Sequence, residues 1–311
     1  MKASINNKLT ARRNFTLTVR KYKEIYIMLI PVVMYYLIFH YAPMYGLVIS
    51  FKNYRPALGI LDSAWVGLKH FRDFFSSFYF WRLLKNTLSI NILGLLFGFP
   101  APIIFALFLN EVRNNRFKRV IQSVTYLPHF ISLAAICSMI IDFFAVNGPI
   151  NAIIKLCGGE AVSFFNTAAW FQPIYIMTNI WADFGWGSIV YLSALTAIAP
   201  ELYEAAALDG ANRWQKMWHI TFMGILPTVT IMLIMKVGHM MSLGSQKILL
   251  LYNPNIYETA DVISTFVYRK GLVGAEYSYT AAVDMFSSVI NFVLLLSVNA
   301  FSRRVNETSL W

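Results

Sequence analysis

Charged and polar residues interrupt the long apolar segments of this chain. Asp183 lies near the middle of one such segment, and Lys236 and His239 lie near the middle of the next. An ionised side chain at the centre of a bilayer costs about 2.5–3.5 kcal/mol on insertion scales, so such groups usually face a protein interior or a water-filled path. Two interpretations stay open: these side chains line a path for a polar solute, or they join helices by pairing, as Asp183 and Lys236 would. The candidate path residues, which include two aromatic side chains close to Asp183, are Asp183, Trp186, Tyr191, Lys236, His239, Asp284 and Asn291.

Other chemistry that residue spacing can reveal is missing from the sequence. No cluster of His, Cys and carboxylate residues has the spacing of metal ligands, and Cys137 and Cys157 have no redox spacing. No Gly-Lys dipeptide occurs, which excludes a Walker-type phosphate loop. No Ser, His and Asp set has the context of a hydrolase. The sequence therefore predicts a protein that is not an enzyme and has no metal site of its own.

The composition indicates the environment in which the polar residues lie. Hydrophobic residues make up 58% of the 311 residues and charged residues 13%, and the mean hydropathy is +0.55. A soluble domain would carry about a quarter charged residues. The apolar residues collect in runs long enough to cross a bilayer as helix, which takes about 20 residues. We expect an all-α, polytopic membrane protein.

Six apolar runs predict six transmembrane helices. Prolines and glycines inside them are tolerated, because neighbouring helices in a membrane can satisfy the freed backbone groups. An even number of spans places both termini on the same side of the membrane. The predicted spans, which together form a transmembrane domain over residues 25–301, are 25–51, 85–109, 120–144, 170–196, 225–251 and 277–301.

The distribution of basic residues identifies that side. The N-terminal tail (1–24), the loop at 110–119 and the C-terminal tail (302–311) carry more basic than acidic residues. Basic residues beside spans mark cytoplasmic segments, so both termini are predicted to be cytoplasmic. This placement explains the net charge of +11 without a nucleic-acid partner. The loop at 52–84 is an exception, since it is basic but predicted to be outside, and its aromatic residues indicate a segment along the membrane surface.

The predicted cytoplasmic loop at 197–224 has the pattern of two short helices joined by a glycine turn. Pro200 suits the first turn of a helix, a run of alanines favours its continuation, and Gly210 can adopt the positive φ that ends it. Asn212 can cap the second helix, with Gln215 in the capping-box position three residues later. The apolar stripe of that second helix is expected to rest on the membrane or on the spans. The loop is thus predicted to be a small rigid knob.

Particular residues of this loop stand in a recognisable order, namely Glu204-Ala205-Ala206, Asp209-Gly210-Ala211, Ile220 and Leu226-Pro227. The pattern resembles the EAA motif of permease subunits of ABC importers. The resemblance extends over most of the chain and is closest to carbohydrate permeases of the MalF type, in their LplB-like branch, which have a MetI-like core. In that family the loop is a coupling helix that fits a cleft on the ATP-binding subunit. The resemblance implies this role for Glu204, Ala205, Ala206, Asp209, Gly210 and Ala211.

The resemblance also implies partners and a substrate class. It implies one transmembrane subunit of a binding-protein-dependent importer for oligosaccharides or polysaccharide fragments, embedded in the lipid of a bacterial cell membrane. A second permease subunit, usually non-identical, two ATP-binding subunits that hold ATP and Mg²⁺, and an extracellular solute-binding protein would complete the importer, and this chain would hold no cofactor. Donors and acceptors in the spans would bind sugar hydroxyls, and aromatic rings would pack on sugar faces. The chain departs from the family at Ser245-Gln246-Lys247, where relatives tend to carry Phe-Glu-Gln, so a relative's substrate preference is not carried over directly.

Two other classes of transporter remain as alternatives. A secondary transporter that works alone usually contains inverted repeats, and the sequence shows no repeat. A permease for amino acids or peptides would share the EAA loop and differ in the lining of its path. Copurifying subunits distinguish the first alternative, and the transported solute distinguishes the second.

Overall fold

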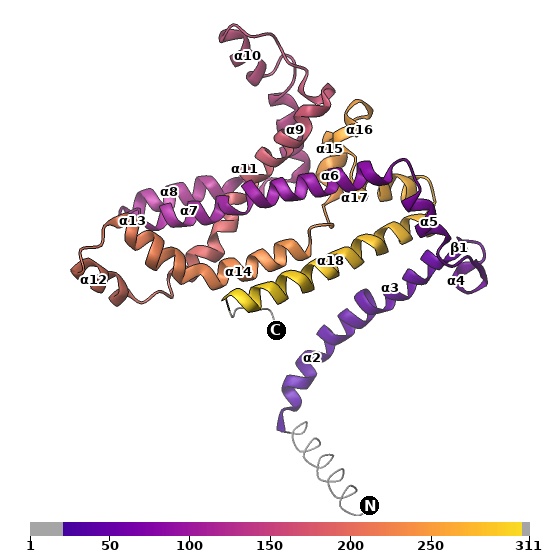
Figure 1. The fold of residues 1–311 in the computed structure, drawn as a ribbon, viewed down its shortest axis with the longest axis horizontal. Coiled ribbons are helices and arrows are strands. Elements are labelled where there is room, and N and C mark those ends of the chain that lie inside the picture. Colours follow the sequence, from indigo (N-terminus) through magenta and orange to yellow (C-terminus); the bar gives the residue numbers. More distant parts are fainter. Residues whose placement is uncertain (1–20, 307–311) are drawn as a thin grey trace, which may run out of the picture. The chain divides into compact units, whose positions relative to one another are not determined.

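The computed structural model describes residues 21–306, and most of them lie in helices (Figure 1). The chain divides into two compact units, one ending at Gly67 and the other beginning at Leu68. Four helices are long and apolar enough to cross a membrane, and two bent helix pairs bring the candidate spans to as many as six. The all-α polytopic fold expected from the sequence is confirmed. Most of the predicted basic tail at 1–24 and half of the tail at 302–311 lie outside the described residues.

The first unit consists of one long helix followed by a small antiparallel hairpin. Its elements are α2 (Lys23–Tyr36), η1 (Leu37–Tyr41), α3 (Ala42–Met44), η2 (Tyr45–Phe51), β1 (Lys52–Arg55), α4 (Gly59–Asp62) and β2 (Ser63–Trp65). The helical elements form one candidate span of 29 residues. This helix widens into the π-turn η1 just before Pro43, whose ring and missing N–H interrupt the regular hydrogen bonds. In the hairpin, Lys52 pairs with Trp65 and Asn53 with Ala64.

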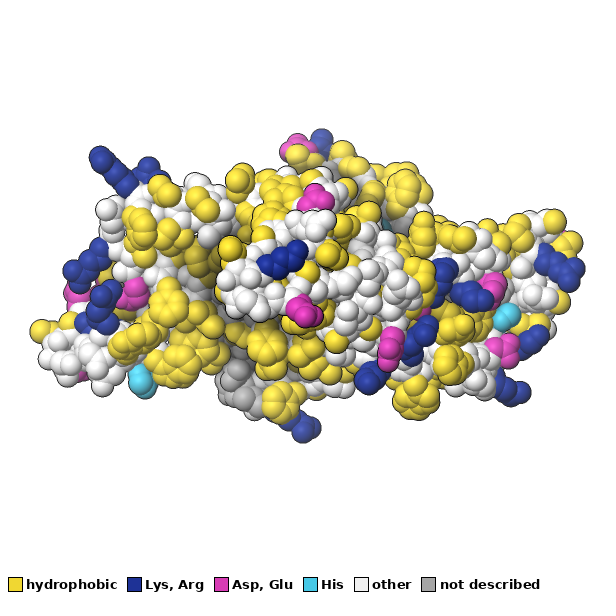
Figure 2. Space-filling model, turned by 90° about the horizontal axis from the view of Figure 1, so that it is seen from above, with side chains coloured by type: hydrophobic (Ala, Val, Ile, Leu, Met, Phe, Trp, Pro, Cys, Tyr) yellow, Lys and Arg dark blue, Asp and Glu magenta, His cyan; other side chains and the backbone are white. Residues whose placement is uncertain are grey.

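Long helices form the body of the second unit. They are α6 (Phe80–Leu93) with η3 (Gly94–Gly98) and α7 (Pro100–Asn110), α11 (Ala168–Leu195), α13 (Arg213–Lys216) with η6 (Met217–Phe222) and α14 (Met223–Gly238), and α18 (Tyr277–Asn306). α11 packs against α7 and α14, and α14 packs against α18. Gly238 permits the close approach of α14 and α18, because a Cβ there would lie 2.5 Å from Cδ1 of Leu295. Apolar side chains cover much of the surface drawn in Figure 2, as expected of helices that lie in lipid.

The structure bends the predicted span at 120–144. The segment consists of α8 (Asn115–Tyr126), η4 (Leu127–Phe130) and α9 (Leu133–Phe143), and the two parts form an angle of 99°. Pro128 lies in the tight turn η4, and Ser132 begins α9 afresh by accepting a hydrogen bond from the Ala135 N–H. A proline followed by an N-capping serine is a local signal for a break between helices. The span is therefore two helices with different directions.

The boundaries of the predicted fifth span also differ from those of the observed helix. The sequence predicts a span at 225–251, whereas the structure has a continuous helix from Arg213 to Gly238. Residues 239–244 form a turn, after which α15 (Ser245–Leu251) begins with Gly244 as its N-cap. The second helix of the predicted knob is therefore the beginning of this span and not a separate element.

Shorter helices complete the second unit. They are α5 (Lys69–Phe75), α10 (Pro149–Leu156), η5 (Phe164–Asn166), α12 (Pro200–Leu208), η7 (Pro254–Ile256), α16 (Tyr257–Ala260), α17 (Ile263–Val267) and η8 (Tyr268–Val273). A core of buried apolar residues that includes Ile140, Phe171 and Ile248 joins α9, α11 and α15. α5 packs against α18. The connecting segments are thus folded against the long helices.

A fully buried carboxylate ties one of these segments to α6. Asp261 accepts hydrogen bonds from Arg82, at 3.3 Å, and from both terminal nitrogens of Arg269, at 2.8 and 3.2 Å. The Asn86 amide donates to the carbonyl of Asp261, at 2.9 Å, and to that of Glu258, at 2.8 Å. Burial lowers the pKa of Arg269, but the hydrogen bonds and the charge of Asp261 outweigh this and raise it. A buried charge is tolerated only when it is paired and hydrogen-bonded, as it is here.

Candidate functional site

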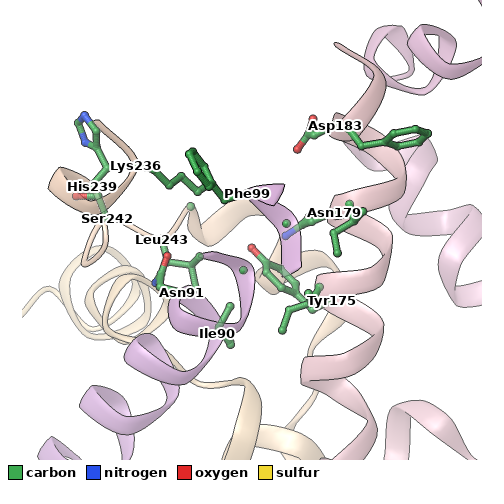
Figure 3. A pocket seen from close by; sticks show the side chains of 16 residues that line it. Ile90, Asn91, Phe99, Tyr175, Asn179, Asp183, Lys236, His239, Ser242 and Leu243 are labelled. Carbon is green, nitrogen blue, oxygen red and sulfur yellow. The ribbon is translucent and has the colours of Figure 1, made fainter. Parts of the chain in front are cut away.

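A cavity of about 460 Å³ lies in the second unit between α6–η3, α11 and the end of α14 (Figure 3). Its polar lining comes from elements far apart in the sequence. Asn91 projects from α6, Lys236 from α14, and His239 and Ser242 from the turn that follows α14. The remaining polar side chains come from α11. Because the cavity combines apolar walls with a few directed polar groups, it has the general character of a small-molecule site.

One face of α11 supplies a ladder of three polar side chains. Tyr175, Asn179 and Asp183 are spaced by four residues and all line the cavity, as residues on one face of a helix do. They present a phenol, an amide and a carboxylate in turn. Figure 3 shows them on one side of the cavity, with Lys236 and His239 on the other. The ladder offers donors and acceptors at successive turns of the helix.

The turn at 239–244 is held in place from α18. The Asn291 side chain accepts a hydrogen bond from the Met241 N–H, at 2.7 Å, and donates one to the Ser242 hydroxyl, also at 2.7 Å. Asn291 does not line the cavity. Its amide fixes the backbone that carries His239 and Ser242, so it shapes the cavity wall from behind.

Only some of the path residues proposed from the sequence line the cavity. Asp183, Lys236 and His239 line the cavity, Trp186, Tyr191 and Asp284 do not, and Asn291 acts behind the wall. Tyr191 is buried in an apolar core with α7 and the fifth span.

The pairing of Asp183 with Lys236, which was one of the two interpretations left open by the sequence, is replaced by another contact. Asp183 Oδ1 lies 3.5 Å from His129 Nδ1, and no ion pair with Lys236 is formed among the described side chains. The ring of His129 in turn stacks on Trp186, with centroids 4.5 Å apart and an interplanar angle of 5°. Trp186 therefore packs against His129, which contacts the cavity residue Asp183. The helix break at η4 brings His129 to this position, which explains why the sequence did not reveal the pair.

Sequence reasoning missed four residues at or beside the cavity. The four-residue spacing within the span at 170–196 was a usable signal for two of them. The other two are supplied by the turn at 239–244 and by α15. The missed residues are Tyr175, Asn179, Ser242 and Lys247.

A second candidate surface lies at one end of the long helices of the second unit, where α12 projects (Figure 1). None of the α12 side chains is buried, and Leu208 is 90% exposed. An exposed, largely apolar helix of this kind is typical of a surface that another protein covers.

The end of α12 has a defined geometry. Gly210 adopts φ +78°. The Ala211 N–H donates to the Ala206 carbonyl, at 2.8 Å, and the Gly210 N–H to the Ala207 carbonyl, at 3.2 Å. These are the two hydrogen bonds of a Schellman motif, in which glycine is favoured because of its positive φ. The turn therefore fixes the direction in which the chain leaves α12.

The next helix begins with the predicted capping box, which is confirmed. The Gln215 N–H donates to Asn212 Oδ1, at 2.9 Å, and the Asn212 N–H donates to Gln215 Oε1, at 2.8 Å. A hollow of about 320 Å³ lies between the two helices. Its lining includes four of the predicted coupling residues, Ala206, Asp209, Gly210 and Ala211. The other two, Glu204 and Ala205, are exposed on α12.

Comparison with known proteins places the chain in a family. A family model described as "Binding-protein-dependent transport system inner membrane component" matches residues 98–307. The chain belongs to this family. The permease is thus an inner-membrane, multi-pass component of a transport system that depends on a binding protein, and it is not a catalytic subunit. The predicted resemblance is confirmed.

Curated relatives from Bacillus subtilis (strain 168) match nearly the whole permease. It is 43% identical to Protein LplB, over 93% of this chain and 91% of that protein. It is 41% identical to the "Polygalacturonan/rhamnogalacturonan transport system permease protein YteP", over 96% of this chain and 94% of that protein. The permease is therefore similar to carbohydrate permeases along its length.

A solved structure shares the fold of the permease. A chain in the "Crystal structure of a bacterial ABC transporter involved in the import of the acidic polysaccharide alginate" superimposes with a TM-score of 0.87 and 41% identity. The match covers 94% of this permease and 99% of that chain. The bent third span and the interrupted fifth span therefore belong to an ABC-permease fold.

Proposed function

We propose that this permease forms one half of the membrane path of an importer for oligosaccharides or polysaccharide fragments. The polar ladder of α11 facing Lys236 and His239 across the cavity is the observation that carries the proposal. Sugars present many hydroxyl groups, each of which donates and accepts hydrogen bonds. The names of the relatives YteP and the alginate transporter support a polysaccharide-derived substrate. A second, non-identical permease subunit would close the path from the opposite side.

Coupling to ATP would take place at α12. Two ATP-binding subunits would hold ATP and Mg²⁺, one of them gripping Glu204 and the small residues around it, while this chain holds no cofactor. The exposure of α12 and its Schellman turn support this role. The chain continues from the turn through the capping box directly into the long helix that ends beside Lys236 and His239. A rigid-body shift of α12 would therefore be transmitted to the cavity wall.

The proposed orientation follows from the same elements. α12 would face the cytoplasm, with both termini on that side, and α10, α15 and α16 would face the extracellular binding protein that delivers the oligosaccharide. The basic residues of α8 and of the segment 110–119 support a cytoplasmic position for this end of the long helices.

Copurification of the tagged permease in mild detergent tests the coupling role. The wild type is expected to retain an ATP-binding subunit and a second permease. Gly210→Trp is expected to lose the ATP-binding subunit while the permease pair stays together, because a tryptophan at φ +78° disrupts the Schellman turn. Gly158→Trp is the matched control, since Gly158 also has positive φ and open space around it but lies after α10.

The possible outcomes separate the candidate functions. Retention of the ATP-binding subunit by Gly210→Trp would contradict coupling through α12. A wild-type chain that purifies alone and moves solute without ATP would instead be a secondary transporter. Stimulation of the reconstituted complex by amino acids or peptides and not by oligosaccharides would contradict the proposed substrate class.

A further inference from the structure

A buried lysine lies directly behind the polar ladder of the cavity. Lys247, on α15, is 7% exposed. Its Nζ donates to the Asn179 Oδ1, at 2.5 Å, and to the Thr178 hydroxyl, at 2.9 Å. The same Nζ lies 5.1 Å from the centroid of the Tyr175 ring, within cation–π range. Lys247 thus contacts two of the three residues of the ladder.

The positive charge of Lys247 is not cancelled by a direct partner. All its hydrogen-bond acceptors recorded in the described structure are neutral, and none of the ion pairs there involves Lys247. Asp183 is the carboxylate among the residues that line the cavity, and its side chain is 71% exposed and adjoins His129. A charge in a poorly hydrated site acts over a longer range than a charge in water. The field of Lys247 therefore extends through Asn179 into the cavity.

Lys247 also fixes which end of the Asn179 amide faces the cavity. The amide oxygen is occupied by the lysine ammonium, so the NH₂ group points toward the cavity space, as Figure 3 shows. An amide NH₂ only donates hydrogen bonds. Without the lysine, the Asn179 oxygen would lose the donor that holds it away from the cavity. Lys247 is thus a positioning residue for Asn179.

The groups around the cavity favour an anion on balance. Lys236 and His239 lie across from Asn179, and Asp183 is the carboxylate among the lining residues. One lysine in the lining, a second lysine behind Asn179 and an amide held as a donor outweigh one carboxylate. A carboxylate on a sugar ring accepts several hydrogen bonds and gains from the positive field, whereas a neutral hydroxyl gains less.

We propose that Lys247, acting through Asn179, makes the path prefer oligosaccharides that carry carboxylates over neutral ones of the same length. This inference rests on the proposed function, since it concerns the selectivity of the same cavity. It assigns the preference to one buried side chain that does not itself line the path.

The test uses the complete complex with its partner subunits, reconstituted in proteoliposomes with saturating binding protein. ATPase stimulation is measured with an oligogalacturonate and with its carboxyl-reduced, neutral counterpart. Lys247→Met keeps the length of the side chain and removes the charge. We expect it to lower the acidic-to-neutral stimulation ratio by about tenfold, the size of one charge-assisted hydrogen bond.

A second variant addresses the same charge without removing the lysine. Asn179→Asp is expected to pair with Lys247, cancel its charge and lower the same ratio, even if Lys247→Met fails to assemble. Lys85→Met, at an exposed lysine of α6 that does not line the cavity, is the matched control and should behave as wild type.

Three results would overturn the inference. An unchanged ratio in either assembled variant shows that the charge does not set the preference. An equal fall with both ligands shows that Lys247 is only a structural residue. A wild-type complex that neither oligosaccharide stimulates contradicts the proposed function itself, and the inference with it.

Discussion

At the scale of single residues, the shape of the cavity depends on side chains that do not line it. Asn291 and Lys247 both act from behind, one by holding the turn at 239–244 and the other by orienting Asn179. Sequence reasoning selects polar residues in spans because burying them is costly. It does not distinguish a residue that lines a path from one that supports the lining. That distinction depends on partners such as Met241, which lies 50 residues from Asn291.

Asn291→Leu should weaken solute binding more than the assembly of the complex. The substitution leaves the Met241 N–H without its acceptor, which costs about 1–3 kcal/mol locally and loosens the turn that carries His239. We expect a several-fold higher oligosaccharide concentration for half-maximal ATPase stimulation, with basal ATPase retained. Asp284→Asn, on the same helix but away from the cavity, should change neither quantity. A normal half-maximal concentration in Asn291→Leu would show that the turn does not need this support.

Part of the site could be predicted from the sequence and part could not. The ladder of Tyr175, Asn179 and Asp183 follows from helical spacing and was predictable. The contact of Lys247 with Asn179 joins residues 68 positions apart. It depends on the interruption after Gly238, which folds α15 back against α11. No local sequence pattern predicts that α15 packs against α11.

At the scale of elements, the loop at 197–224 combines local and long-range features. The capping box at Asn212 and the glycine turn were predictable because every atom involved lies within a few residues. The continuation of the second helix into the fifth span was not. An apolar stripe on a short surface helix and the first turns of a span have the same pattern. The break at Pro128 and Ser132 carried a local signal that the predicted span at 120–144 overlooked.

An ion pair links the loop to the second span. The Arg213 guanidinium donates to Glu111 Oε2 at 2.9 and 3.2 Å, and to the Glu111 backbone carbonyl at 3.4 Å. Arg213 begins α13, and Glu111 directly follows α7. The Arg213 side chain is 66% exposed, so the pair contributes at most about 1 kcal/mol to stability. Its significance is therefore its position between the loop that contains α12 and the end of the second span.

Arg213→Glu should reduce the number of oligosaccharides imported per ATP hydrolysed, with little change in thermal stability. The repulsion separates the start of α13 from the end of α7, so motion of α12 reaches only one of the two helices. The double variant Glu111→Arg/Arg213→Glu restores the opposite charges and should recover most of the ratio. Failure of the double variant to recover would show that the effect of Arg213→Glu does not arise from this pair.

At the scale of the whole molecule, the proposed topology places α12 and the loop after α10 on opposite sides of the membrane. The two cysteines provide a direct test, since Cys137 is buried and Cys157 is exposed. In right-side-out vesicles, a membrane-impermeant maleimide should label the wild type at Cys157. It should not label Leu208→Cys in a Cys157→Ser background until the vesicles are inverted. Labelling of both positions from the same side would refute the topology.

The number of spans also belongs to this scale. Composition predicted six apolar segments, and four of them are long helices of sufficient length and apolarity. The other two candidates are bent helix pairs. α8 with η4 forms an angle of 99° with α9, and α11 forms an angle of 75° with α12. Hydropathy reports how much apolar chain is present, but not its direction. Direction depends on turns and caps, such as Ser132 and the residues that precede Pro200.

The continuous helix from Arg213 to Gly238 relates a tilt of the fifth span to the displacement of its two ends. Its 26 residues correspond to a rod of about 39 Å at about 1.5 Å per residue. A tilt of about 10° around the midpoint of such a rod moves each end by about 3.4 Å, in opposite directions. The helix begins directly after the α12 turn and ends at the cavity wall. A tilt of this size would therefore move the end that carries Lys236 by as much as the end beside α12, and in the opposite direction.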